Sequence, residues 1–219
     1  MHTQVLIVAA PGRGPRIECV GGVAARRTAP DAVHLVSTAA TPLGGDTIAV
    51  RVVVEAGARL RVRSVAAMMV LPAATTTQSR SGWDLDVAGE LDIDPEPTVI
   101  AGGSSHEATT RLQIAGAGRV RVRERVQIGR TGEEHGFWSG SLHVDRDGLP
   151  LVRHRVELGA GAVSDDEIAA PRAYVSEFRY PESDFGVIRT AERYESRRDH
   201  VVMALADGGC LSAWQGARL

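Results

Sequence analysis

Lysine is absent from this chain of 219 residues, so arginine supplies every basic side chain apart from histidine. One explanation is a surface that binds carboxylates in a bidentate manner, which the planar guanidinium favours; the alternative is a coding bias of the genome. Cysteine is scarce as well, because only Cys19 and Cys210 are present and neither lies in a CxxC pair. Two distant cysteines exclude a disulfide framework and a cysteine metal knuckle, and they predict a reducing, cytoplasmic setting.

Aromatic residues make up only 4% of the chain, so we expect the core to be built from Val, Leu, Ile and Ala. Hydrophobic residues make up 43% and charged residues 24%, which is ordinary for a globular protein and fits a single domain over 1–219. The net charge of −2 argues against non-specific nucleic-acid binding. The apolar run within the first ten residues is too short for a signal peptide or a membrane span, so no membrane association is predicted.

Apolar and polar residues alternate with a period of two in several segments, namely Ile48–Glu55, Arg59–Arg63 and Arg119–Ile128. This period is typical of strands that have one buried and one solvated face. Glu124 interrupts the apolar side of the last segment, which predicts either a sheet edge or a polar contact at that point.

Turn signals recur every ten to twenty residues between these segments. They are Pro42–Asp46, Glu55–Ala58, Asp94–Pro97, Ala115–Gly118, Gly129–Gly132, Asp145–Gly148 and Asp207–Gly209. Asp147-Gly148 predicts a tight hairpin between two strands. Helix signals are restricted to Ser164–Ala169 and Thr190–Arg198, and no clean internal repeat is present. The sequence therefore predicts an all-β fold with one or two short helices.

Two of these turns carry groups that could bind a metal ion or a partner. Asp46 follows a Gly-Gly turn that could present its carboxylate, although Pro-x-Gly-Gly-Asp is also a good structural turn. In the second segment Glu133, Glu134 and His135 follow one another. Two carboxylates beside an imidazole could hold a borderline divalent ion such as nickel, and the alternative is a solvated loop.

His143 and His154 form a weak candidate metal pair. If Asp147-Gly148 is a two-residue turn, Val152 lies opposite His143 and His154 is its diagonal neighbour on the same face. Diagonal neighbours lie about 7–8 Å apart, but two histidines do not make a structural zinc site, which needs four ligands.

No motif in the sequence indicates catalysis. Ser104, Ser105 and His106 are adjacent along the chain, yet adjacency does not make a catalytic triad. No GxSxG elbow surrounds any serine, and no HExxH, P-loop or GxGxxG motif is present.

Taken in order, several of these segments together resemble the UreD family of urease accessory proteins, over roughly Ser37 to Leu158. The matching segments are the Leu43–Asp46 turn, Glu55–Ala58, Pro95–Gly103, Gly129–Glu133 and the hairpin that ends at Val156. The chain departs from the family at Ser64–Val70, where many members carry a Thr/Gln-rich strand that ends in Lys-Val/Ile-Tyr.

The resemblance implies an elongated, β-helix-like scaffold of many strands in stacked sheets, without enzymatic activity. It also implies direct binding to UreF, contact through UreF with the GTPase UreG, and docking of the complex on apo-urease. Nickel(II) would be bound only transiently, with no tightly held cofactor. In that role Asp46 and Glu133 become candidates for a polar transfer route or a docking surface, and Arg130 could orient a carboxylate there.

Two other functions remain open from the sequence. A carbohydrate- or ligand-binding β-sandwich would need an aromatic platform, for which Trp83 and Trp138 are the candidates. A β-fold hydrolase would have to use His106 or His135.

Overall fold

Seventeen strands make up the secondary structure of the protein, for which a computed structural model describes residues 1–133, 135–166, 170–182 and 200–219. Among these residues there is no α-helix, and hence none long and apolar enough to cross a membrane. The all-β prediction is therefore confirmed. The described part of the predicted helix Ser164–Ala169 is not helical, and Thr190–Arg198 lies outside the described residues.

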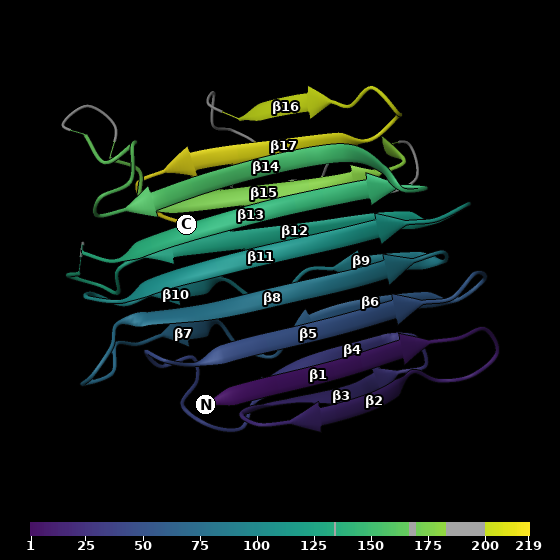
Figure 1. Ribbon diagram of the computed structural model, residues 1–219, viewed down its shortest axis with the longest axis horizontal. Helices are drawn as coiled ribbons and strands as arrows, with labels where there is room; N and C mark the ends of the chain where they lie inside the picture. Colours follow the sequence, from purple (N-terminus) through teal and green to yellow (C-terminus); the bar gives the residue numbers. More distant parts are fainter. Residues whose placement is uncertain (134, 167–169, 183–199) are drawn as a thin grey trace.

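The strands follow the turn signals of the sequence closely (Figure 1). Their bounds are β1 (His2–Ala9), β2 (Arg16–Val20), β3 (Val23–Ala29), β4 (Ala32–Ser37), β5 (Thr47–Val54), β6 (Arg59–Ser64), β7 (Met68–Val70), β8 (Gln78–Val87), β9 (Glu90–Ile93), β10 (Thr98–Ile100), β11 (Ser105–Ile114), β12 (Arg119–Ile128), β13 (Phe137–Arg146), β14 (Leu149–Gly159), β15 (Ala173–Tyr180), β16 (Val201–Ala204) and β17 (Cys210–Gly216).

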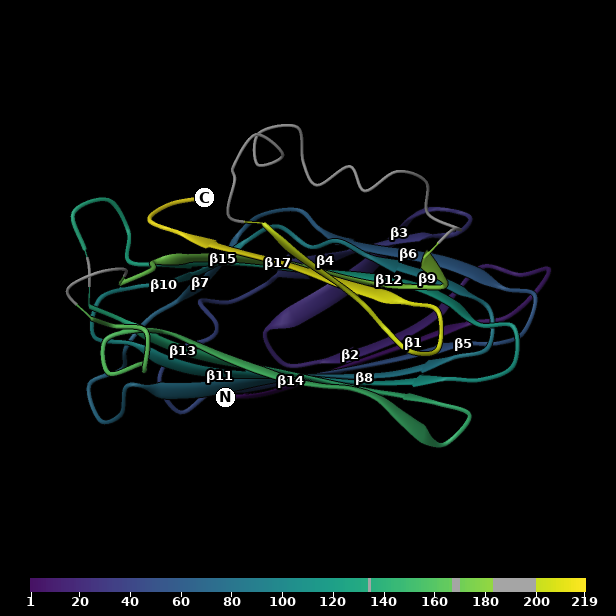
Figure 2. The ribbon, with the colours of Figure 1, turned by 90° about the horizontal axis from the view of Figure 1, so that it is seen from above.

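Two sheets stack face to face (Figure 2). Sheet A has seven strands in the order β14-β13-β11-β8-β5-β1-β2. Sheet B has ten strands, in the order β16-β17-β15-β12-β9-β6-β4-β3, with β10 and β7 paired beside β12.

The chain winds between the two sheets in successive coils. It runs along sheet A in β5, returns through sheet B in β6 and β7, and repeats this path in β8 to β10 and in β11 to β12. Equivalent strands pair in parallel, which gives the predicted stacked, β-helix-like arrangement. The coils differ in length, because Thr47 lies opposite Arg80 whereas Gln78 lies opposite Ser105. Unequal coils explain why the sequence shows no clean repeat.

Alternate residues of most strands point into the space between the sheets and form the core. In sheet A, Val52, Leu85 and Leu112 are partners on consecutive strands, and each is at most 1% exposed. Leu60 and Leu91 pair in the same way in sheet B and are fully buried. Burial of one such side chain contributes about 1.5–3 kcal/mol, so aliphatic residues carry the core, as the low aromatic content predicts.

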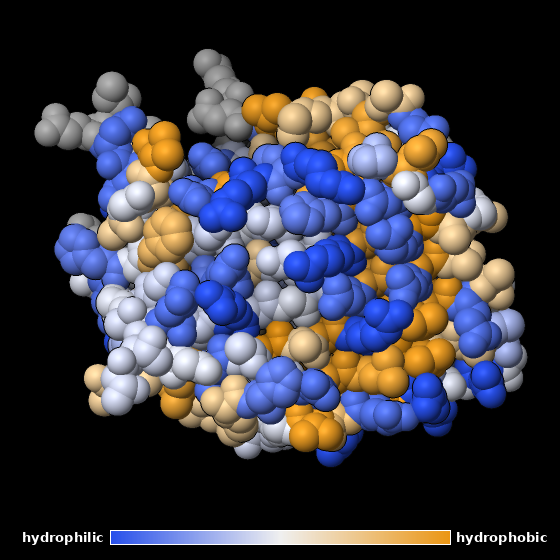
Figure 3. Space-filling view, viewed as in Figure 1, coloured by the Kyte–Doolittle hydropathy of each residue, from blue (hydrophilic) through white to orange (hydrophobic). Residues whose placement is uncertain are grey.

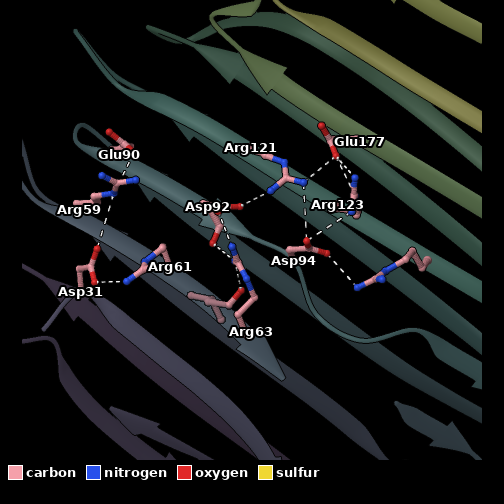
Figure 4. Close-up of polar contacts among 12 residues, drawn as sticks. Asp31, Arg59, Arg61, Arg63, Glu90, Asp92, Asp94, Arg121, Arg123 and Glu177 are labelled. Atoms are coloured by element: carbon pink, nitrogen blue, oxygen red, sulfur yellow. Dashed lines mark hydrogen bonds and ion pairs between the residues drawn. The ribbon is translucent and has the colours of Figure 1, made fainter. Parts of the chain in front are cut away.

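Arginines on the outer face of sheet B form a ladder of ion pairs with carboxylates (Figure 4). At its centre Glu177, which is 1% exposed, accepts hydrogen bonds from Arg121 at 3.1 Å and from Arg123 at 2.8 Å, and it also pairs with Arg179. Burial opposes ionisation of Glu177, but the guanidinium groups of Arg121, Arg123 and Arg179 together outweigh it and lower the pKa of the carboxyl. This face is therefore a packed ionic layer.

The ladder reaches from β15 to the β3–β4 turn across the strands of sheet B. Its members are Asp31, Arg59, Arg61, Arg63, Glu90, Asp92, Asp94, Arg121, Arg123, Arg125, Glu177 and Arg179. The alternating arginines of the sequence thus bind carboxylates. This agrees with the first explanation for the missing lysine, a surface whose guanidinium groups bind carboxylates.

Among the residues that the structure describes, β16 is the edge strand of sheet B, and it carries no charged side chain. All four of its residues are exposed, with Val201 at 56% and Val202 at 47%. Figure 3 shows apolar side chains gathered at this edge of the molecule, at the top of the view. Free backbone groups next to exposed apolar side chains make such an edge prone to pair with another chain.

We predict that Leu112→Ala lowers the free energy of unfolding by about 2–5 kcal/mol, because it leaves a cavity between the sheets. Its neighbour Gln113 is exposed on the other face of β11, so Gln113→Ala should change stability by less than about 0.5 kcal/mol. Chemical denaturation followed by circular dichroism measures both values. Equal losses in the two variants would contradict this assignment of the buried face.

Candidate functional site

The Thr41–Asp46 turn encloses the Asp46 carboxylate, which is 5% exposed. Its Oδ2 accepts hydrogen bonds from the Thr41 hydroxyl at 2.8 Å and from the Leu43 N–H at 2.9 Å, while Oδ1 pairs with the amino group of Met1. Burial opposes ionisation, but these donors outweigh it and lower the pKa of Asp46. The side chain therefore holds the turn together, and its role toward a metal or partner stays a prediction.

The two glycines before Asp46 are required by the backbone of this turn. A Cβ on Gly44 would lie 1.8 Å from the Thr76 carbonyl oxygen, so the two backbones can approach only because position 44 has no side chain. Gly45 has a φ of +87°, which favours glycine.

Arg130 and Glu133 form the ion pair that the sequence suggests. The Arg130 Nε donates to Glu133 at 3.0 Å, and Glu133 also accepts from the Gly102 N–H at 2.9 Å. The Arg130 guanidinium lowers the pKa of Glu133 to about 2, so the carboxylate stays charged. Glu133 thereby joins its loop to the loop before β11. His135 is exposed and Glu134 lies outside the described residues, so a joint site of these groups stays a prediction.

His143 and His154 do not share a face, which corrects the register predicted for the hairpin. Asp147 and Gly148 form the expected turn, with φ values of 48° and 80°. A β-bulge between Val144 and Asp145 then shifts the pairing, so that His143 lies opposite Arg153 and not Val152. Pro150 sits at this irregularity and has no N–H for the ladder, which explains the shift. His154 points inward and His143 outward.

The space between the sheets is polar near the starts of β8 and β11 in sheet A, which face the middle of β12 in sheet B. His106 is 1% exposed, and its two ring nitrogens lie 2.8 Å from Ser79 Oγ and 2.9 Å from Ser81 Oγ. Burial lowers the pKa of His106 to about 4, so the imidazole is neutral near pH 7. Ser104, its neighbour in sequence, instead contacts the Val70 carbonyl.

Glu124 is the carboxylate of this inner space. It lies on β12 between β9, β10 and β15, which excludes the sheet-edge explanation of its position. The side chain is half-buried by surface area because it borders internal cavities, yet desolvation raises the pKa of Glu124 to about 7. Desolvation governs its ionisation, since both sheets cover the carboxyl at this level. Glu124 is thus poised to exchange a proton near neutral pH.

Tyr174 and His154 close the polar space on the side of β14 and β15. The Tyr174 hydroxyl lies 3.3 Å from His154 Nε2, and its ring packs against Trp138 with centroids 5.5 Å apart. Burial lowers the pKa of His154 and raises that of Tyr174, so both groups are neutral near pH 7.

Three cavities follow one another between the sheets and share walls. The first, of about 220 Å³, is lined mainly by apolar residues beside the Ser64–Met68 segment. The second, of about 60 Å³, contains His106 and Glu124, and the third, of about 20 Å³, contains Glu124, His154 and Tyr174. The first two share Met68, Ser81, Trp83, Pro95, Glu96 and Thr98. The last two share Thr110, Val122, Glu124 and Trp138.

We take this row of cavities as the candidate functional site. It combines the inner carboxylate of Glu124 and the exposed carboxylate of Glu96 with two imidazoles and several hydroxyls, without a closed set of ligands. The described residues contain no group of three or more His, Cys, Asp or Glu that could hold a metal. The sequence placed Glu124 in a strand but could not show that it lines the same cavity as His106. The sequence signal that could have located this site is the set of polar residues at inward positions of consecutive strands.

The two tryptophans proposed as an exposed platform face inward, which corrects that expectation. Trp138 is 1% exposed, and Trp83 lines the cavities between the sheets. Both rings follow the inward alternation of their strands, so they pack between the sheets and do not form an exposed aromatic platform.

We predict that Glu124→Gln stabilises the protein above about pH 4.5, with most of the gain reached by about pH 7. The folded state keeps a proton on Glu124 up to pH about 7, whereas an unfolded chain releases it near the ordinary value of 4.5. The stability that protonated Glu124 contributes at low pH is therefore lost as the pH rises from its unfolded-state pKa through its folded-state pKa. Chemical denaturation should show the Gln variant more stable by roughly 1–3 kcal/mol at about pH 8 and equal to the unmodified protein at about pH 4.

Glu107→Gln, on the exposed face of β11, serves as the control and should show no such dependence. A Glu124→Gln variant whose stability tracks the unmodified protein at both pH values would contradict the burial of an ionisable Glu124.

Comparison with known proteins places the chain in a family. The model of the UreD urease accessory protein matches residues 23–181. A relative named urease accessory protein UreD 1, from Saccharopolyspora erythraea, is 39% identical over 157 residues, which cover 71% of this chain and 60% of that protein. The UreD protein of Frankia alni is 44% identical over 145 residues, covering 58% and 49%, respectively.

The UreD protein of Streptomyces avermitilis is 38% identical over 161 residues, covering 69% of this chain and 64% of that protein. The chain thus spans about two fifths to two thirds of the length of the curated relatives that it matches. The matched region includes the coils from β3 to β15 and every strand that lines the row of cavities. The chain belongs to the UreD family of urease accessory proteins.

Proposed function

We propose that this protein is a non-catalytic scaffold for urease maturation that assists the delivery of nickel into the apo-urease active site. It would bind UreF directly, contact UreG through UreF, and dock on the urease subunits as part of that complex. Membership of the UreD family supports a role in urease maturation. The observation that carries the nickel proposal is the polar row of cavities around Glu124.

The chemistry of that row suits a transient nickel ion. Nickel accepts imidazole and carboxylate ligands, and neutral imidazole is the form that binds a metal. His106 and His154 are neutral near pH 7, and Glu124 can exchange its proton for a cation. Because the groups are spread along the row, no position offers a full coordination sphere, and an ion would be held weakly enough to leave.

The groups singled out in the sequence are further docking or transfer candidates in this proposal. They are Asp46, Arg130, Glu133, Glu134 and His135. Asp46 and Glu133 also hold their turns, so loss of nickel in their variants must be compared with complex formation.

Free thiols support a cytoplasmic site of action. Cys19 and Cys210 are both unpaired by disulfides, as is usual in a reducing compartment.

Replacement of Glu124 by Gln should lower nickel loading of urease, because the amide cannot exchange a proton for a cation. We expect about a tenfold slower activation of apo-urease and a matching loss of bound nickel. The assay uses the variant with its accessory partners and urease, and measures nickel per urease by atomic absorption.

Glu107→Gln is the matched control, since it makes the same chemical change on the outer face of β11. Full nickel occupancy with the Glu124 variant, in a complex of normal composition, would refute a role of the row of cavities. It would leave the scaffold role standing.

Co-expression with UreF should give a stable complex, whereas the protein alone should self-associate. The exposed, uncharged β16 edge gives the physical reason. Size-exclusion chromatography with light scattering measures both states. A monodisperse monomer that does not bind UreF would contradict the scaffold proposal.

A further inference from the structure

An open groove of about 660 Å³ lies at the corner of the sandwich where three turns converge. The β1–β2 turn forms one wall, and the β3–β4 and β5–β6 turns form the others. In Figure 1 the β1–β2 and β5–β6 turns lie at the right-hand end of the molecule, away from β16. The groove is separate from the row of cavities, since their linings share no residue.

Three arginines line this groove, and one of them is held in place. They are Arg13, Arg27 and Arg59. A Cβ on Gly14 would lie 2.1 Å from Arg27 Nη1, so the guanidinium rests directly on the backbone of the β1–β2 turn. Because position 14 has no side chain, the guanidinium of Arg27 can lie in the groove.

Arg13 and Arg27 differ from most arginines of the protein because neither has an ion-pair partner among the residues that the structure describes. Most of the other guanidinium groups are paired with carboxylates, as in Arg51–Asp86, Arg80–Glu107 and the ladder of sheet B. Two uncompensated cations in one hollow therefore stand out in a chain of net charge −2.

The acidic residue in the groove does not neutralise them. Asp31 is bound to Arg61, with Nη2 to Oδ1 at 2.7 Å, and this hydrogen bond lowers the pKa of the carboxyl. Arg59 lies 3.8 Å from Asp31 and pairs with Glu90 at 3.0 Å. The charges of Arg13 and Arg27 thus remain available to a ligand.

We propose that this corner groove binds a carboxylate-rich peptide segment of a protein partner. Guanidinium groups bind carboxylates through paired, charge-assisted hydrogen bonds. The groove is far larger than a single anion requires, and its open form suits an extended segment. The proposal is independent of nickel delivery, and the β1–β2 turn lies outside the residues that the UreD family model matches.

A peptide fits the groove better than a nucleic acid does. Nucleic-acid binding needs many basic contacts along a phosphate backbone, whereas here two free arginines stand beside Asp31. An alternative role for Arg27 is to protect β3, the edge strand of sheet B, from pairing with other chains. That role requires no ligand, and binding measurements separate the two.

The test uses the full chain and a fluorescein-labelled octaglutamate peptide, followed by fluorescence anisotropy at low and at physiological ionic strength. We expect saturable binding that weakens with salt. Arg13→Ala combined with Arg27→Ala should weaken it about tenfold. Gly14→Ala, which keeps both charges but places a methyl group where the guanidinium rests, should weaken binding as well.

The matched control is Arg26→Ala combined with Arg218→Ala, which removes the same charge from two exposed arginines outside the groove. It should bind the peptide as the unmodified protein does. Equal weakening in the control and in the groove variants would overturn the proposal, as would unchanged binding in both groove variants. A single-stranded oligonucleotide of matched charge that binds more tightly than the peptide would overturn it too. Loss of urease nickel in the Glu124 variant bears on none of these outcomes.

Discussion

Parallel pairing of successive coils is the constraint on which the rest of the structure depends. Once β5, β8 and β11 lie side by side, the inward positions of one coil stack on those of the next. An aliphatic residue at such a position meets another one, as Val52 meets Leu85. The same rule acts on the outer face of sheet B, where arginines of β6 and β12 flank the carboxylates of β9. The aliphatic core and the ionic ladder thus both result from the parallel pairing of successive coils.

The same stacking creates a change of polarity along the inner space. Near the turns after β5, β8 and β11 the inward residues are aliphatic and exclude water. Toward the starts of β8 and β11, serine and histidine take the inward positions, and Glu124 joins them from sheet B. A buried carboxylate is costly unless it is neutral or paired, so its place beside cavities indicates that this part of the interior serves more than stability.

Sequence reasoning reached the strands, the turns and the family, because alternation and turn chemistry are local signals. It placed β5, β6 and β12 and the Asp147-Gly148 turn correctly. It failed where distant strands decide the outcome: the bulge opposite Pro150 separated His143 from His154, and coil stacking turned Trp138 inward. The partners of Glu177 could not be inferred either, since they come from strands far apart in the chain. The roles of Asp46 and Glu133 in nickel transfer stay predictions.

The all-arginine ladder has a consequence for chemical labelling. Acylating reagents and common cross-linkers attack primary amines, and this chain offers none on a side chain. Lysine acetylation, methylation and ubiquitin attachment likewise have no acceptor in it. The positive charges that bind Asp92, Asp94 and Glu177 are therefore beyond the reach of the modifications that most often erase surface charge. A cross-linking map of the protein's complexes must instead use carboxylate- or thiol-directed reagents.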